Sequence, residues 1–219
     1  MSTESPQKNI VVLISGSGTN LQALIDAAAA NKLGGAKIQQ VISSSASAYG
    51  LTRAANGNVP SYVHTLQCDK YYGKLAKDDR AARKAARLQF NRDLATHILE
   101  LSPRPDLIVC AGWMLILAPE FLGPVEEEAG ISIINLHPAL PGAFAGTHAI
   151  QRAWEAGQKG EITKGGVMIH KVIAAVDEGE PLIVKEIELK KDETVEEYED
   201  RVHAVEHEAI VEGTIKALE

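Results

Sequence analysis

The chain has 219 residues, of which 45% are hydrophobic and 23% are charged, which is typical of one globular domain with a full core. Its formal net charge of -7 argues against a general nucleic-acid-binding protein, which would normally present a basic face. No apolar stretch approaches the roughly 20 residues of a membrane span, and its two distant cysteines, Cys68 and Cys110, favour the reducing cytoplasm.

The first half of the chain alternates apolar runs of strand length with helical patterns. Residues 1–8 are polar and are expected to form a flexible tail. Residues 9–14 form a continuous apolar run rich in β-branched residues, typical of a central parallel strand buried on both faces. Further strands are expected at 37–43, 61–66 and 106–111, and helices at 21–28, 50–55 and 70–101. This alternation predicts βαβ units and an α/β fold with a parallel sheet.

The second half continues the alternation. Strands are expected at 131–137 and 165–176, and the alternating segment 182–189 predicts an edge strand or hairpin partner. One helix is expected to start near Thr147, with His148 as a capping or packing residue or as a catalytic one. An amphipathic helix is expected over 194–218.

A glycine-containing turn follows the first strand. Residues 15–20 read Ser-Gly-Ser-Gly-Thr-Asn, and a helical pattern comes next. Backbone N–H groups of such a turn and of a helix start suit a phosphate group, although many βα turns need glycine only for their backbone angles. The turn is neither a Walker loop nor a complete dinucleotide fingerprint.

The strand at 131–137 ends in Asn135-Leu136-His137-Pro138. Side chains two apart in a strand share a face, so Asn135 and His137 converge at its carboxyl end, where open α/β sheets bind ligands. Asp177 also follows a predicted strand. An amide donor, an imidazole and a carboxylate form a plausible acyl-transfer set, in which the amide stabilises an oxyanion. The alternative is a structural, hydrogen-bonded histidine.

Other chemistry-bearing features have two interpretations each. His170, Glu178 and Glu180 match no metal motif and are best explained as part of a solvated acidic turn, so no metal is expected. The basic stretch 70–87 is either a solvated helix face or a cationic rim for a polyanionic ligand tail. The apolar stretch 112–117 is either a buried turn or the wall of a hydrophobic pocket.

Several ordered motifs resemble the phosphoribosylglycinamide formyltransferase family, also called glycinamide ribonucleotide transformylases, which are folate-dependent enzymes of purine synthesis. The motifs are residues 10–23, 111–117, 134–138, 146–148 and 170–179. The resemblance implies a Rossmann-like, three-layer, open and mostly parallel sheet with helices on both faces. It also implies a single formyltransferase domain over 9–219, with a phosphate-binding half to about 105 and a catalytic and folate-binding half after it.

The resemblance further implies roles for individual residues. Asn135, His137 and Asp177 match the catalytic trio. The substrate-binding positions are Gly16, Ser17, Gly18, Thr19, Asn20 and Glu206, and the folate-binding positions are Arg87, Met114, Leu115, Ile116, Leu117, Asn135, Ala174 and Val176. The cosubstrate would be 10-formyltetrahydrofolate, and the acceptor would be the amine of phosphoribosylglycinamide. The partners are thus small molecules rather than nucleic acid or membrane, and a monomer or weak homodimer is expected.

The implied mechanism is direct attack through a tetrahedral intermediate. Asn135 and a protonated His137 would donate to the negative oxygen, and Asp177 would raise the pKa of His137 by Coulomb attraction. Three positions depart from the family pattern. Leu115 stands where many members have arginine, residues 139–144 are less polar than usual, and His203 stands where some members have lysine near the phosphate.

Two alternative functions stay open. A formyltetrahydrofolate hydrolase would share the three residues but add an amino-terminal domain, whereas about eight residues precede the first predicted strand here. A formyltransferase acting on tRNA is disfavoured because no basic RNA-binding segment follows the last predicted helix. A nucleotide-binding module without turnover is the remaining alternative.

Overall fold

The structure is a computed structural model and describes residues 7–219, so most of the expected tail at 1–8 lies outside the described residues. Lys8 is described, and its ammonium lies 3.2 Å from the carboxylate of Asp106 in an exposed ion pair. The chain divides into two compact units, Met1–Ile133 (unit 1) and Ile134–Glu219 (unit 2). Within residues 7–219, no helix is both long enough and apolar enough to span a membrane.

Unit 1 contains a parallel sheet. Its strands are β1 (Asn9–Ile14), β2 (Lys37–Ser43), β3 (Ser61–Val63) and β4 (Leu107–Cys110), in the order β3-β2-β1-β4. Every residue of β1 and β4 is buried, which explains why their sequences are apolar apart from Asn9. The expected βαβ units are therefore confirmed. The strand expected to reach residue 66 ends at Val63, because β2 ends at Ser43 opposite it.

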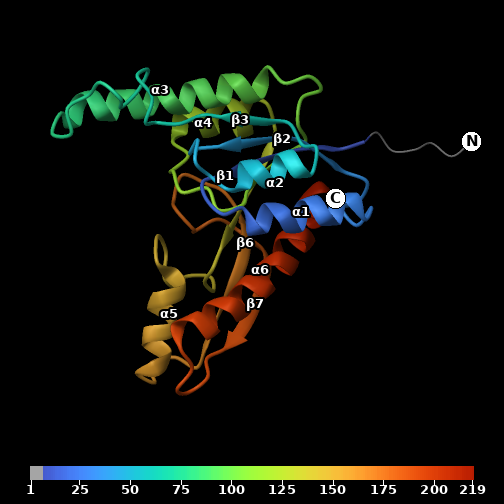
Figure 1. The fold of residues 1–219 in the computed structure, drawn as a ribbon, viewed down its shortest axis with the longest axis vertical. Helices are drawn as coiled ribbons and strands as arrows, with labels where there is room; N and C mark the ends of the chain where they lie inside the picture. The colour runs from blue at the N-terminus through green and yellow to red at the C-terminus, as the bar shows by residue number, and fades with distance from the viewer. Residues whose placement is uncertain (1–6) are drawn as a thin grey trace, which may run out of the picture. The chain divides into compact units, whose positions relative to one another are not determined.

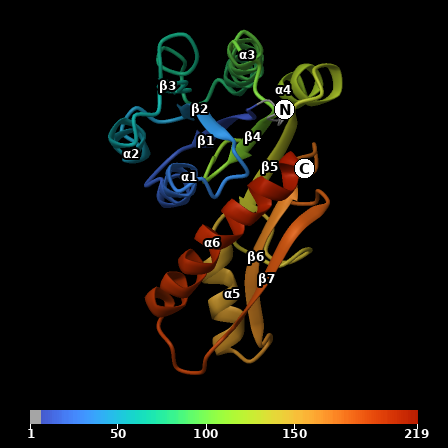
Figure 2. The same cartoon turned by 90° about the vertical axis from the view of Figure 1, so that its right-hand side faces the viewer.

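Helices cover both faces of this sheet (Figures 1 and 2). Helices α1 (Thr19–Ala29) and α2 (Gly50–Asn56) lie on one face, and α3 (Arg80–Leu99) and α4 (Pro119–Leu122) on the other. The sequence did not predict α4 or the π-helix that follows it, η1 (Gly123–Glu128).

The helix expected to begin at residue 70 begins ten residues later. Asp79 caps α3 by accepting a hydrogen bond from the Ala82 N–H at 2.9 Å. Before this cap the chain turns back on itself: a Cβ atom on Gly73 would lie 2.9 Å from backbone atoms of Asp69 and Cys68. The turn buries Tyr71, so residues 70–79 pack as a loop instead of extending the helix.

Unit 2 contains an antiparallel arrangement. Strand β5 (Ser132–His137) enters it and pairs with β6 (Lys164–Lys171), which pairs with β7 (Pro181–Glu188) as the expected hairpin partner. The strand expected to continue to residue 176 ends at Lys171, because the chain leaves the sheet in a turn over 172–180.

Two helices complete unit 2. Helix α6 (Val195–Leu218) begins with a capping box formed by Thr194 and Glu197, and it packs along β6 and β7. Helix α5 (Ala149–Gln158) contacts α6 and β6. His148 is the residue before α5, but its exposed side chain makes no capping hydrogen bond, so the capping and packing interpretations are wrong and the catalytic one stays a prediction.

Candidate active site

The candidate catalytic residues lie in unit 2, at the ends of β5 and β6. Asn135 and His137 are on β5 and share a face, as the alternation predicts. The antiparallel register places His170 of β6 directly opposite Asn135. The turn that follows β6 then returns Asp177 towards both strands. The pairing of β5 with β6 and the turn after β6 therefore bring four polar side chains together.

Asp177 is the centre of this cluster. Its Oδ2 atom lies 3.4 Å from Nδ1 of His137, and its Oδ1 atom lies 3.4 Å from Nδ2 of Asn135 and 3.5 Å from Nε2 of His170. The carboxylate is 9% exposed and the His137 side chain 6%. The structure thus brings together the three residues that the sequence nominated as catalytic.

The loop between β5 and α5 closes the cluster on another side. The Phe144 carbonyl oxygen lies 3.2 Å from Nε2 of His137, and the Gly146 N–H donates to Oδ2 of Asp177 at 2.9 Å. Phe144 and Asp177 both adopt left-handed backbone angles, with φ of 49° and 58°. Such angles are strained in residues other than glycine and are concentrated at functional sites.

The ring of His137 has a pKa below its ordinary value of 6.5, with burial as the largest cause. The charge of Asp177 and the Phe144 carbonyl act in the opposite direction but do not compensate. The expectation that Asp177 would raise this pKa overall is therefore wrong, because burial is the stronger effect. His137 is mainly neutral at pH 7.

The pKa of Asp177 is also below its ordinary range. Burial acts to raise it but is outweighed by the adjacent His170 ring, by the hydrogen bond from the Gly146 N–H and by the nearby His137 ring. Asp177 is consequently a carboxylate at neutral pH and can only accept hydrogen bonds.

His170 is the residue that sequence reasoning missed. It was assigned to a solvated acidic turn, yet its side chain is 2% exposed. Glu178 and Glu180 do fit that interpretation, since both are exposed and Glu180 pairs with Lys171 at 2.7 Å. Only the register of β5 and β6 could have indicated that His170 faces Asn135. Over residues 7–219, no three His, Cys, Asp or Glu side chains are placed to hold a metal ion.

The glycine turn of unit 1 has the features of an anion-binding helix start. Gly18 precedes α1 with a φ of 72° and provides no side-chain cap. An added Cβ there would lie 2.6 Å from the Cα of Gly50, so only glycine fits. Arg53, which the sequence did not single out, donates to the Ser17 carbonyl at 2.9 Å and stabilises the turn.

Apolar side chains are exposed at two of the expected folate-binding segments. In unit 1, Met114 and Ile116 are 67% and 55% exposed, whereas Leu117 is buried. The Met114 N–H donates to the Ser15 hydroxyl at 2.9 Å, which ties this segment to the end of β1. In unit 2, Val176 is exposed as well.

The remaining candidates have more varied surroundings. Glu206 is buried on α6, and Arg87 is half-buried on α3. Ala174 is exposed in the turn after β6, and Leu115 is half-buried. His203 is partly exposed and lies 3.8 Å from Glu199.

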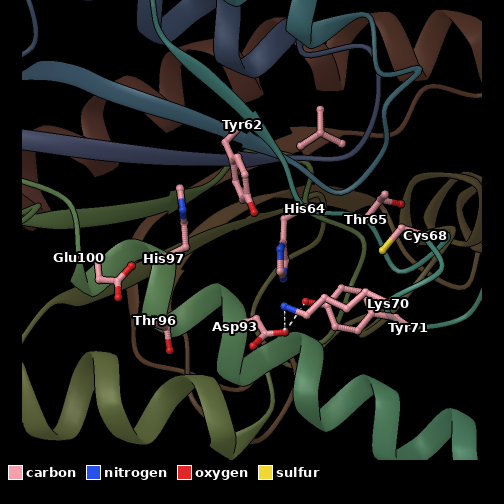
Figure 3. Close-up of a pocket in the computed structure, with 11 residues that line it drawn as sticks. Tyr62, His64, Thr65, Cys68, Lys70, Tyr71, Asp93, Thr96, His97 and Glu100 are labelled. Atoms are coloured by element: carbon pink, nitrogen blue, oxygen red, sulfur yellow. Dashed lines mark hydrogen bonds and ion pairs between the residues drawn. The ribbon is translucent and has the colours of Figure 1, made fainter.

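Unit 1 also contains a pocket of about 360 Å³ between β3 and α3 (Figure 3). Tyr62 stacks on His97 with their ring centroids 4.0 Å apart. Below them, the carboxylate of Asp93 pairs with Lys70 at 2.8 Å and accepts from the Tyr71 hydroxyl. None of the catalytic, substrate-binding or folate-binding positions nominated from the sequence lines this pocket, although Lys70 and Tyr71 of the basic stretch do.

Comparisons with known proteins identify the family to which the chain is similar. A sequence model of the family described as "Formyl transferase" matches residues 8–214. The phosphoribosylglycinamide formyltransferase of Saccharomyces cerevisiae is 54% identical over 96% of this chain and 97% of that protein. The protein of the same name from Schizosaccharomyces pombe is 49% identical over 94% of each.

Solved structures show the same likeness. The crystal structure of glycinamide ribonucleotide transformylase 1 from Symbiobacterium toebii matches with a TM-score of 0.78 and 30% identity, over 98% of this chain and 89% of that chain. The expected α/β fold class is thereby confirmed.

Proposed function

The chain belongs to the formyl transferase family, and we infer that it is the enzyme that transfers the formyl group of 10-formyltetrahydrofolate to the amine of phosphoribosylglycinamide in de novo purine biosynthesis. The observation that carries this function is the buried cluster of Asn135, His137 and Asp177 in a chain 54% identical to a protein of that name. The family model covers both units, which supports treating residues 9–219 as one formyltransferase domain.

We propose that the exposed apolar side chains receive the folate. The apolar faces of the flat pterin ring suit Met114 and Ile116, and backbone groups near Ala174 and Val176 would supply contacts for its polar edge. Because leucine stands at 115, any polar contact at that position uses its backbone. Arg87 would attract the acidic tail of the folate.

The phosphate of the acceptor would bind at the glycine turn of unit 1. The turn over 16–20 opens α1, whose first N–H groups and positive dipole end favour an anion. This local attraction holds the phosphate although the chain as a whole carries a net negative charge. Glu206 is the proposed ribose ligand.

His137 is proposed to move the proton. A ring that is neutral in the free enzyme can accept the proton that the attacking amine must lose. Negative charge that forms on the formyl oxygen raises the pKa of the adjacent ring, so His137 becomes an imidazolium as the tetrahedral intermediate forms. It then returns the proton to the departing N10 nitrogen.

Asn135 and Asp177 stabilise the charges of that intermediate. The amide of Asn135 donates to the negative oxygen. Asp177, held as a carboxylate, stabilises the imidazolium form of His137 from the Nδ1 side. Residues over 139–144 would have to shift so that Nε2 of His137 exchanges the Phe144 carbonyl for the substrate.

One assay separates this function from its alternatives. Loss of the formyl group from the folate is followed by absorbance, with and without phosphoribosylglycinamide. Formyl loss only in the presence of the acceptor supports the transferase. Loss without acceptor would indicate a hydrolase, and binding without turnover would indicate a non-catalytic module.

We further propose a cytoplasmic enzyme that works on small molecules, as a monomer or weak homodimer. The net charge of -7 argues against a nucleic-acid partner, and the two unpaired cysteines, one of them buried, support the reducing cytoplasm. Light scattering behind size-exclusion chromatography would measure the mass, and a stable tetramer would contradict it.

A further inference from the structure

His170 lies inside the buried cluster, and the mechanism above gives it no part. We infer that His170 is a positioning residue, whose contact with Asn135 fixes which end of that amide can face the reacting centre. The inference rests on the proposed function, in which Asn135 donates to the oxyanion.

The tautomer of His170 follows from its neighbours. Its Nδ1 atom lies 2.8 Å from the carbonyl oxygen of Lys171, and a carbonyl oxygen can only accept, so Nδ1 carries a proton. Nε2 also lies 3.5 Å from Oδ1 of Asp177, but its nearer neighbour is the amide of Asn135, so we infer that Nε2 keeps a lone pair and accepts from that amide. Nδ2 of Asn135 lies 3.2 Å from this atom. The ring therefore selects the NH₂ end of the amide and not its oxygen.

Asn135 uses its two amide hydrogens unequally. One meets the lone pair of His170 at 3.2 Å, and the other faces the carboxylate of Asp177 at 3.4 Å. When negative charge develops on the formyl oxygen, the second hydrogen can be shared with it while the first stays on His170. The ring thus anchors the amide and leaves one hydrogen for catalysis.

Without an acceptor at the Nε2 position, the two amide hydrogens of Asn135 no longer have separate roles. Among the described residues, Asp177 would then be the one remaining anchor of the NH₂ group, and it holds the hydrogen that the oxyanion needs. The amide could also rotate and present its oxygen, which repels the developing charge. Both changes weaken the transition state and leave substrate binding nearly unaffected.

Two amide substitutions at residue 170 form a matched test. Glutamine places its terminal amide at the depth of Nε2, where its oxygen can accept from Asn135. Asparagine reaches only the depth of Nδ1, where it can bond the Lys171 carbonyl. We expect His170→Asn to lower kcat by about 10- to 100-fold with KM values little changed, and His170→Gln to recover most of the loss.

The control is His97→Asn, which removes a comparable contact between a histidine and the Gln40 side chain in unit 1, where Nε2 lies 2.8 Å from Oε1. We expect it to leave kcat unchanged. Equal kcat values for His170→Asn and His170→Gln would overturn the inference, as would a loss confined to KM.

A spectroscopic measurement makes the test independent of turnover. In protein labelled with ¹⁵N at asparagine, the side-chain amide of Asn135 is identified by its loss in Asn135→Ala. We expect its hydrogens to exchange slowly in the wild type and in His170→Gln, and faster in His170→Asn. If the wild type proved inactive in formyl transfer, the proposed function would fail. Unchanged hydrogen exchange of the Asn135 amide in His170→Asn would separately refute the positioning contact.

Discussion

Each unit contains histidines near a carboxylate, but the two carboxylates differ in the side chains that contact them. In unit 1, Asp93 is neutralised by Lys70 and bonded by Tyr71, and its pKa is low because these contacts outweigh burial (Figure 3). Its neighbouring histidines point elsewhere. His64 lies 2.9 Å from the Phe90 carbonyl, and His97 bonds Gln40. These contacts form closed pairs within the protein and stabilise the fold.

In unit 2, Asp177 faces imidazole rings in place of a permanent cation, and its Oδ2 atom faces the titratable ring of His137. His137 and His170 both lie within 3.5 Å of its oxygen atoms. A ring can gain a proton when negative charge appears beside it, whereas the ammonium of Lys70 is already charged. The comparison teaches that a carboxylate paired with a permanent cation stabilises the fold. A carboxylate paired with a histidine, which can change its charge, can take part in catalysis.

Removing a ring from each group tests this contrast most strongly. His137→Ala should lower kcat by about 10²- to 10³-fold, because the transition state loses a donor and a proton acceptor together. His97→Ala in unit 1 should leave kcat unchanged. Steady-state kinetics on both purified variants, with folding checked by circular dichroism, measures the difference. Near wild-type transfer by folded His137→Ala would contradict the assignment.

The carboxylates offer the next test. Asp177→Asn should lower kcat by about 10²-fold, since the amide keeps the shape but no longer stabilises the imidazolium form of His137. KM should change little, because the lost interaction is made mainly in the transition state. The same kinetic assay measures it. An effect on KM alone would show that Asp177 acts in binding.

The sequence could predict those features that depend on local pattern. The buried run 9–14 predicts β1, and alternation places Asn135 and His137 on one face of β5. Asp177 could be nominated because it follows a strand. The family resemblance supplied the roles of these residues, which periodicity could not.

Features that depend on tertiary contacts escaped prediction. The role of His170 requires the register of β5 against β6, which no local pattern gives. The start of α3 depends on the folding back of residues 70–79, although their composition favours a helix. The direction of the His137 pKa shift depends on how deeply the ring is buried, which overrides the charge of Asp177.

The low pKa of His137 predicts how catalysis depends on pH. Because kcat/KM requires a neutral ring, its logarithm should fall more steeply below the His137 pKa, which lies under 6.5. The substrate amine, with a pKa of about 8, must also be neutral, so the slope should change from about one to about two as the pH falls. Initial rates from pH 5 to 9 would measure this profile, and a rise in kcat/KM towards acid would show that the imidazolium is the active form.

The smallest effect is expected in unit 1, where Asp93→Asn removes the charge of the closed pair. We expect a loss of about 1 kcal/mol in the free energy of unfolding at pH 7. A buried charged hydrogen bond would contribute more, but the Lys70 side chain is 63% exposed, so solvent weakens this pair. The folded-state pKa of Asp93 lies below 3.8, so its contribution is complete above that pH and disappears as the pH falls through the folded-state value. Urea denaturation of the wild type and the variant should therefore give curves that differ at pH 7 and converge in acid, with equal kcat at pH 7. A variant that kept its stability but lost formyl transfer would place Asp93, too, among the groups that serve the chemistry.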